Sequence, residues 1–171
     1  MIGDRAMTSG AITVVALSAW LGAAILVAAV VAPAAFAVLP SRTLAGALVG
    51  RVLPVLFYAG AVVGLVVAIL ARGTMPSGAR VVAGATITAA CLAAQLLVAP
   101  RIERIRVDAA RPIDELAPGD PRRAAFGRLH GVSVLLLGAA ALAGGAALVL
   151  TLRTMSLAAA SHDPSNTSLQ H

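Results

Sequence analysis

The chain has 171 residues, of which 60% are hydrophobic, and its mean hydropathy is +0.95. Soluble domains contain about 45 to 50% apolar residues, so this composition excludes an ordinary soluble domain and indicates an integral membrane protein of one domain. The formal net charge is +6, and its aromatic residues are few and not interleaved with the arginines. This pattern argues against nucleic acid as a partner and leaves the lipid bilayer as the expected surroundings.

Residues 1–10 form a short polar leader, and the stretch 11–39 after it is uncharged. A helix of that length extends over roughly 40 Å, more than the roughly 30 Å hydrocarbon core of a bilayer, so we expect it to span the membrane. Residues 35–37 (A-F-A) also resemble the cleavage site of a signal peptide. The apolar stretch is longer than the roughly 7 to 15 residues of such signals, which favours an uncleaved helix, loosened near Pro33.

Three further uncharged stretches, each bracketed by arginines, predict spans at 51–72, 80–101 and 128–153. Ser41 and Asp120 are placed to cap the helices that lead into the second and fourth spans. Residues 101–127 are predicted to form a cytoplasmic helical extension and loop, and 158–171 a disordered tail. The predicted fold is therefore all-α, an integral membrane, up-and-down bundle of four transmembrane helices within residues 11–157.

Arginine counts predict the orientation of this bundle. The first and third connections carry nine arginines, and the opposite side carries four, namely Arg5, Arg72, Arg80 and Arg153. Because positive loops stay in the cytoplasm, both termini are expected to be extracytoplasmic.

Small residues predict how the helices meet. Three G-x-x-x-G pairs occur, at Gly46 and Gly50, at Gly60 and Gly64, and at Gly127 and Gly131. Such pairs allow close approach of helix backbones, either within one chain or between chains. Packing within the chain is the favoured interpretation, and a homo-oligomer or a membrane partner is the alternative.

An intramembrane polar face is predicted on the third span. Thr88, Cys91 and Gln95 are spaced so that they share one side of the helix, and the amide of Gln95 needs a polar partner. This face should point into the bundle. An interhelical hydrogen bond is the favoured role over a substrate contact, and Cys91 is interpreted as a small apolar filler.

The fourth span opens with F-x-x-L-H-G-x-S, which places His130 and Ser133 on one face near the cytoplasmic boundary. We define an inner-mouth cluster at this level: Arg51, Arg101, Arg128, His130 and Ser133. The cluster could form a proton, metal or anion site, or His130 could simply bridge helices beside the headgroups, which is the favoured interpretation. His130 is a weak candidate ligand for a metal or haem, since no second interior histidine is present.

The order of these features resembles the bacterial membrane family called domain of unknown function 4149, which is similar to the eukaryotic transmembrane protein 205. The resemblance covers roughly residues 11–150. It is carried by Trp20, Gly22, Ala32, Pro33, Phe36, Leu39, Pro40, Leu44, Ala45, Gly46, Gly50, Arg51, Pro54, Pro100, Arg101, Ile102, Phe126, Leu129, His130, Gly131 and Ser133. It implies a four-span bundle in a bacterial inner membrane and no established reaction. The eukaryotic relative is associated with tolerance to platinum drugs.

Three functions are compatible with the sequence, which has no catalytic motif and is not expected to be an enzyme. The first is transport, export or tolerance of a small solute or metal complex through the inner-mouth cluster. The second is a haem- or metal-binding electron-transfer or assembly protein that uses His130. The third is a structural or partner-binding membrane protein that uses the G-x-x-x-G faces.

Overall fold

The computed structural model describes residues 2–72 and 77–161, and nearly all of this part of the chain is helical. The elements in order are α1 (Ile2–Leu26), the π-helical turn η1 (Val27–Val31), α2 (Ala32–Val38), α3 (Arg42–Ala71), α4 (Gly78–Ala93), the π-helical turn η2 (Ala94–Val98), α5 (Ala99–Ala109), the short 3-10 helix η3 (Ile113–Glu115) and α6 (Pro121–Ser161).

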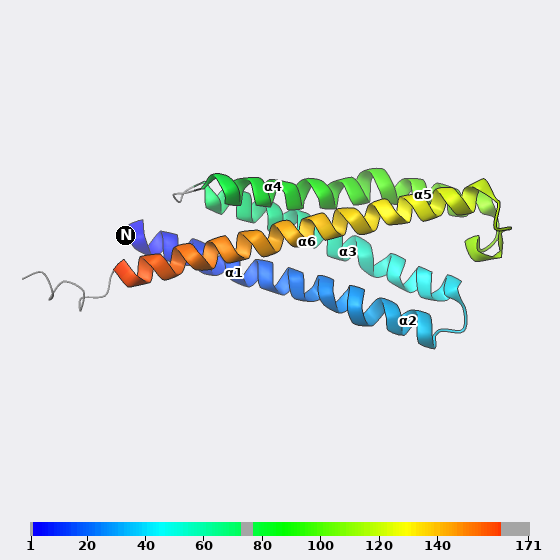
Figure 1. The fold of residues 1–171 in the computed structure, drawn as a ribbon, viewed down its shortest axis with the longest axis horizontal. Coiled ribbons are helices and arrows are strands. Elements are labelled where there is room, and N and C mark those ends of the chain that lie inside the picture. Colours follow the sequence, from blue (N-terminus) through cyan, green and yellow to red (C-terminus); the bar gives the residue numbers. More distant parts are fainter. Residues whose placement is uncertain (1, 73–76, 162–171) are drawn as a thin grey trace, which may run out of the picture.

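These elements form four long rods that run up and down side by side (Figure 1). The first rod is α1, η1 and α2, the second is α3, the third is α4, η2 and α5, and the fourth is α6. Each rod contains a segment long and apolar enough to cross a membrane: Met7–Val38, Arg42–Ala71, Gly78–Ala109 and Pro121–Ala158. The predicted all-α bundle of four transmembrane helices is therefore confirmed.

The helices are longer than the uncharged stretches from which they were predicted. The leader at residues 2–10 belongs to α1, and residues 158–161 of the predicted tail belong to α6. The rest of that tail, 162–171, and most of the turn between α3 and α4, 73–76, lie outside the described residues. The membrane-spanning segments have 30 to 38 residues each, so they are longer than the roughly 20 residues that cross a hydrocarbon core.

Side chains cap the two helices that follow the connections. The Ser41 hydroxyl accepts a hydrogen bond from the Leu44 amide at 3.2 Å, as its position predicted. Asp120 likewise accepts from the Arg122 amide at 2.8 Å, directly before Pro121 opens α6. The hydrogen bond from the Arg122 side chain is the main cause that lowers the pKa of Asp120 from its ordinary 3.8 to about 2.

Both π-helical turns end one residue before the sequence Ala-Pro. The amide of Ala32 donates to the Val27 carbonyl ahead of Pro33, and the amide of Ala99 donates to the Ala94 carbonyl ahead of Pro100. Proline has no amide hydrogen to continue the α-helical pattern, and a π-turn is one way in which a helix absorbs that interruption. The loosening expected near Pro33 thus lies in the turn before it.

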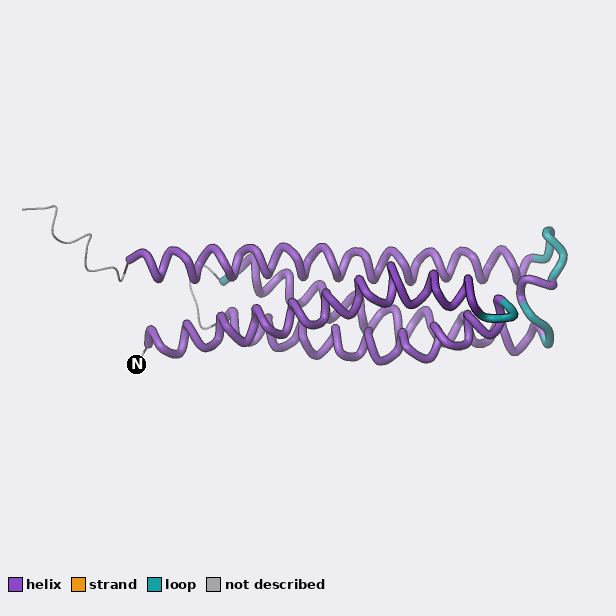
Figure 2. Tube along the Cα trace, turned by 90° about the horizontal axis from the view of Figure 1, so that it is seen from below, coloured by secondary structure: helices purple, strands orange, loops and turns teal. Residues whose placement is uncertain are grey.

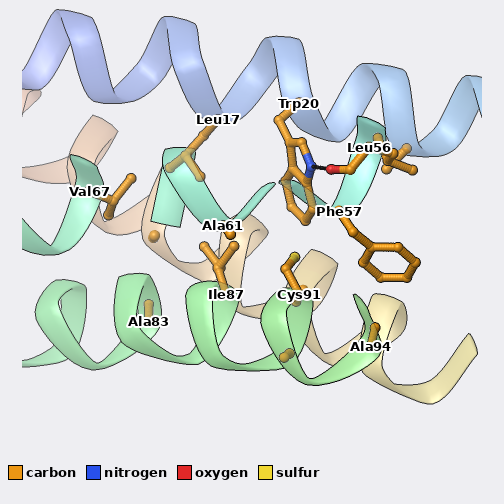
Figure 3. Close-up of a cluster of buried hydrophobic side chains, with 14 residues drawn as sticks. Leu17, Trp20, Leu56, Phe57, Ala61, Val67, Ala83, Ile87, Cys91 and Ala94 are labelled. Carbon is orange, nitrogen blue, oxygen red and sulfur yellow. Dashed lines mark hydrogen bonds between the residues drawn. The ribbon is translucent and has the colours of Figure 1, made fainter. Parts of the chain in front are cut away.

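The core is built around Trp20 of α1, which is 4% exposed. Its indole nitrogen donates to the Leu56 carbonyl of α3 at 3.0 Å (Figure 3). A Cβ atom at Gly60 would come within 2.8 Å of both the indole and the Cys91 sulfur, so only glycine leaves room there. The ring also lies near Gly144 of α6. One side chain therefore contacts or approaches the other three rods.

The tightest backbone packing joins α3 and α4. A Cβ atom added at Gly64 would lie 2.7 Å from the Gly84 carbonyl oxygen, and one at Gly84 would lie 2.6 Å from the Gly64 oxygen. The Thr88 hydroxyl, beside this contact, shares its proton between two carbonyls, that of Gly84 in its own helix at 3.0 Å and that of Ala61 in α3 at 3.2 Å. Gly60 and Gly64 thus pack within the chain. In contrast, a Cβ atom added at Gly46, Gly127 or Gly131 would meet no atom within 4 Å, so those faces are open inside the chain.

The two ends of the bundle differ. We call the end with the start of α1 and the end of α6 the terminal end, and the end with the connections 39–41 and 110–120 the arginine-rich end (Figure 2). At the terminal end the rods converge, and Arg80 is buried there at 7% exposure together with Thr13 and Thr151. Only a hollow of about 10 Å³ remains among them, room for about one water molecule.

Candidate functional site

A cavity of about 510 Å³ lies between the rods toward the arginine-rich end. Here α2 and α3 diverge from α5 and α6 (Figure 1). Its walls are mainly apolar, with Phe36, Leu53, Pro54 and Phe57 among the lining residues. Phe57 also belongs to the buried core, so it forms the floor of the cavity. A volume of this size is typical of sites for small molecules.

A few polar side chains converge on this apolar space. Gln95 of η2 reaches it from one side, and His130 and Ser133 of α6 reach it from another. Gln95 lies within the π-turn, where the wider helix spacing turns residues away from the ordinary helical pattern, a distortion often found at functional sites. The arrangement provides an amide, an imidazole and a hydroxyl around an otherwise hydrophobic pocket, which is how many ligand sites fix orientation.

A second space, which we call the vestibule, adjoins the cavity and has a volume of about 700 Å³. The two share Phe36, Gly46, Glu103, Arg106 and Phe126, so they are continuous. The vestibule is lined by charged groups at the ends of helices. They are Arg42, Arg106, Arg111, Arg123, Glu103 and Asp114.

Arg106 lies where the cavity and the vestibule meet. Its guanidinium carbon is 5.5 Å from the centre of the Phe126 ring, in a cation–π contact. The Phe126 ring in turn stacks on the His130 ring, with centroids 6.2 Å apart and planes 2° from parallel. Arg106 is also 3.8 Å from the Glu103 carboxylate, a long ion pair that leaves both groups partly exposed. These contacts position a cation and an imidazole along one wall.

The structure separates the residues of the inner-mouth cluster. His130 and Ser133 line the cavity, but Arg51, Arg101 and Arg128 are exposed and line neither the cavity nor the vestibule. Arg101 donates a hydrogen bond to the Leu97 carbonyl of its own rod. The arginine that lines the same cavity as His130 is Arg106, which the sequence did not single out; it contacts Phe126, the ring that stacks on His130.

The predicted polar face of the third rod points inward. Cys91 is fully buried beside Gly60, Thr88 bonds across to α3, and Gln95 lines the cavity. The three residues therefore have different surroundings: Cys91 lies in the packed core, Thr88 is half-buried at the contact between α3 and α4, and Gln95 contacts the open cavity.

The sequence analysis used Arg80 as a boundary of a span and in the arginine count for the orientation, and the structure shows that it is buried at the terminal end. Nothing in the spacing of the arginines signals this. Within residues 2–72 and 77–161, no three histidine, cysteine, aspartate or glutamate side chains gather in a way that could hold a metal ion. A metal or haem site at His130 stays a prediction.

The fold and this cavity define an α-helical, multi-pass membrane protein. A comparison with protein families matches residues 15–111 to the family described as a domain of unknown function (DUF4149), and the chain belongs to that family. The match runs from α1 to just past α5. It is shorter than the resemblance over 11–150, and His130 and Ser133 lie beyond it. No curated protein and no solved structure matches the chain.

Proposed function

We propose that this protein is a non-enzymatic membrane protein that binds a small, mainly apolar molecule in the cavity and takes part in its transport, export or tolerance. The observation that carries the proposal is the open space of about 510 Å³ between the rods, on which Gln95, His130 and Ser133 converge. A second space of about 450 Å³, between α1 and α3, is lined by apolar side chains and has no such polar groups. Packed helical bundles leave few voids, so a space of this size favours a ligand or a conformational change that fills it.

Gly46 offers a direct test of this role. It lines both the cavity and the vestibule, and no atom lies within 4 Å of the position where its side chain would begin. Gly46→Trp should therefore place an indole in the open space without displacing the backbone. Gly22→Trp is the matched control, because Gly22 also has open space around it but lines neither the cavity nor the vestibule.

The measurement is growth of a deletion strain that carries each variant, under cisplatin and under a panel of amphipathic toxicants. Cisplatin is included because the resemblance to transmembrane protein 205 suggests platinum tolerance. Gly46→Trp should reduce tolerance to that of the deletion strain, and Gly22→Trp should behave as wild type, at equal protein levels. Wild-type tolerance from Gly46→Trp, or no protection by the wild-type protein against any compound, would contradict the proposed role.

We further propose a bacterial inner membrane as the location, with both termini extracytoplasmic. The count of nine arginines against four supports this orientation. Reporter fusions test it: a fluorescent protein that folds only in the cytoplasm should be bright when inserted at Gly119 and dark when fused to the C-terminus. The reverse pattern would show that both termini are cytoplasmic and would contradict the proposed orientation.

Partner binding is a second candidate, favoured by one face of α6. Gly131, Gly138 and Gly145 alternate with Leu135 and Leu142, which are 73% and 78% exposed, in a seven-residue repeat. Small and large residues at this spacing suit helix–helix packing, and a second copy of the chain could supply the other helix. Gly138→Ile should then convert a dimer to a monomer in native mass spectrometry. A wild-type protein that is monomeric in a bilayer mimetic would end this candidate.

A further inference from the structure

We propose that the cavity and vestibule together bind an anionic membrane lipid, with its phosphate among the vestibule arginines and an acyl chain in the cavity. This inference rests on the proposed function and names the chemical class of the ligand. The two adjoining spaces match the two parts of an amphiphile: the apolar cavity suits its hydrocarbon chain, and the charged vestibule suits its headgroup.

The charge of the vestibule favours an anion. Four arginines, namely Arg42, Arg106, Arg111 and Arg123, face two carboxylates, Glu103 and Asp114, which leaves a formal excess of two positive charges. The side chain of Arg106 is 38% exposed, and its ion pair with Glu103 is long at 3.8 Å, so the guanidinium keeps donors for a further acceptor. Guanidinium groups suit phosphate because they donate two parallel hydrogen bonds.

The position of the two spaces along the rods favours a lipid over a free anion. Leu53, Phe57 and Ser133 lie within the uncharged stretches that predict the spans, whereas Arg106 and Arg111 lie beyond the third stretch, near the headgroup level. An amphiphile seated from the bilayer would thus keep its chain at hydrocarbon depth and its phosphate at the interface. In the first rod, α1 packs extensively on α6, but α2 does not. The first and fourth rods therefore separate beside α2, at the depth where an acyl chain would enter.

The test uses the full-length protein in nanodiscs that contain a trace of photoactivatable lipid. Two lipids carry the same diazirine acyl chain, one a phosphatidylglycerol and one a zwitterionic phosphatidylcholine, and mass spectrometry locates the label. Phosphatidylglycerol should label peptides that line the cavity in α3 and α6, at least about fivefold more than phosphatidylcholine. About fivefold is the effect of one arginine near an anionic lipid.

Arginine variants identify the headgroup site. Arg106→Gln and, on a different helix, Arg42→Gln should each lower the phosphatidylglycerol label about fivefold, and Arg106→Lys should restore part of it. Arg104→Gln is the matched control, since Arg104 is on the same helix as Arg106 and lines neither space. Labelling that is unchanged in both Arg106→Gln and Arg42→Gln would overturn the assignment.

Two further arms separate the possible failures. If phosphatidylglycerol and phosphatidylcholine label the cavity equally and Gly46→Trp removes both labels, the cavity binds lipid without preference for charge; the inference fails and the proposed function stands. If no label enters the cavity and Gly46→Trp still supports wild-type tolerance, both fail. Two competitors are then compared, inorganic phosphate and a short-chain phosphatidylglycerol. Excess inorganic phosphate should leave the phosphatidylglycerol label in place. If phosphate reduced the label as much as the short-chain lipid did, the site would bind phosphate alone and the lipid assignment would be overturned.

Discussion

The same four rods are packed closely in the terminal half of the bundle and are separated by open space in the arginine-rich half. In the terminal half, Gly64 and Gly84 bring the backbones of α3 and α4 into contact, and the hollow beside Arg80 has a volume of only about 10 Å³. In the arginine-rich half, Pro33 and Pro100 follow π-turns and Pro54 lies inside the continuous helix α3, and the cavity and vestibule lie there.

Glycine permits close approach only where a second backbone faces it, as Gly64 and Gly84 face each other, whereas Gly46 and Gly127 face open space. Proline limits regular helix packing, so the prolines in the arginine-rich half are consistent with its wider spacing.

The largest effect on this contrast is expected from Gly64→Leu. Its Cβ atom would lie 2.7 Å from the Gly84 carbonyl oxygen, which belongs to backbone and cannot move aside without separating α3 from α4. We expect a loss of about 3 kcal/mol or more in the free energy of unfolding. Titration with sodium dodecyl sulfate in mild detergent measures it, with Gly22→Leu as the control at an open position. Equal stability of the two variants would mean that the close contact does not hold the terminal half together.

Trp20→Phe should come next in size. The change removes the hydrogen bond to the Leu56 carbonyl and leaves a gap where α1, α3, α4 and α6 meet, at a cost of about 2 kcal/mol. Tyr58→Phe is a matched aromatic control, because Tyr58 is 49% exposed. The same titration compares the two. A Trp20→Phe protein as stable as the Tyr58→Phe protein would show that the ring is not central to the core.

A smaller effect is expected from Thr88→Val, which keeps the shape of the side chain and removes the hydroxyl that bonds to the Ala61 carbonyl. Hydrogen bonds between helices in membranes contribute about 0.6 kcal/mol on average, and we expect a loss of that order. Thr86→Val serves as the control, because the Thr86 hydroxyl is exposed and bonds only within its own helix. If the two variants lose the same amount, the bond between the helices adds nothing.

The smallest effect concerns the cap of α6 at the arginine-rich end. Because the pKa of Asp120 is lowered from 3.8 to about 2, its stabilising effect is fully present above about pH 4 and is lost as the pH falls toward 2. Asp120→Ala should therefore be less stable than wild type near neutral pH, and this difference should shrink across that window. Thermal unfolding followed by circular dichroism at several pH values measures it, and a difference independent of pH would argue against a charged cap.

Much of the fold could be predicted from sequence, because length, hydrophobicity, capping residues and small-residue spacing act locally. The four helices, the caps at Ser41 and Asp120, and the inward face of Thr88, Cys91 and Gln95 depend on such signals. Together they specify which segments are helices and which faces pack.

The site was harder to predict, because it depends on how each rod is rotated about its axis. A π-turn breaks the 3.6-residue pattern, so the pattern of the third rod before η2 does not extend to α5, which carries Arg101 and Arg106. His130 and Ser133 both line the cavity, and the helical spacing between them applies because α6 is unbroken. Their neighbouring arginine was not identified, since many exposed arginines share that end of the molecule.

The contrast between the two halves can be tested most directly by thiol accessibility in a Cys91→Ala background. Ser133→Cys places a thiol on the cavity wall, and Thr151→Cys places one at a site that is fully buried at the terminal end. In protein purified in mild detergent without added lipid and treated with N-ethylmaleimide, Ser133→Cys should react faster than Thr151→Cys, and adding Gly46→Trp should slow its reaction, while Thr151→Cys should react only after unfolding. Equal protection of the two thiols, or Ser133→Cys labelling that Gly46→Trp leaves unchanged, would contradict an open cavity at the arginine-rich end.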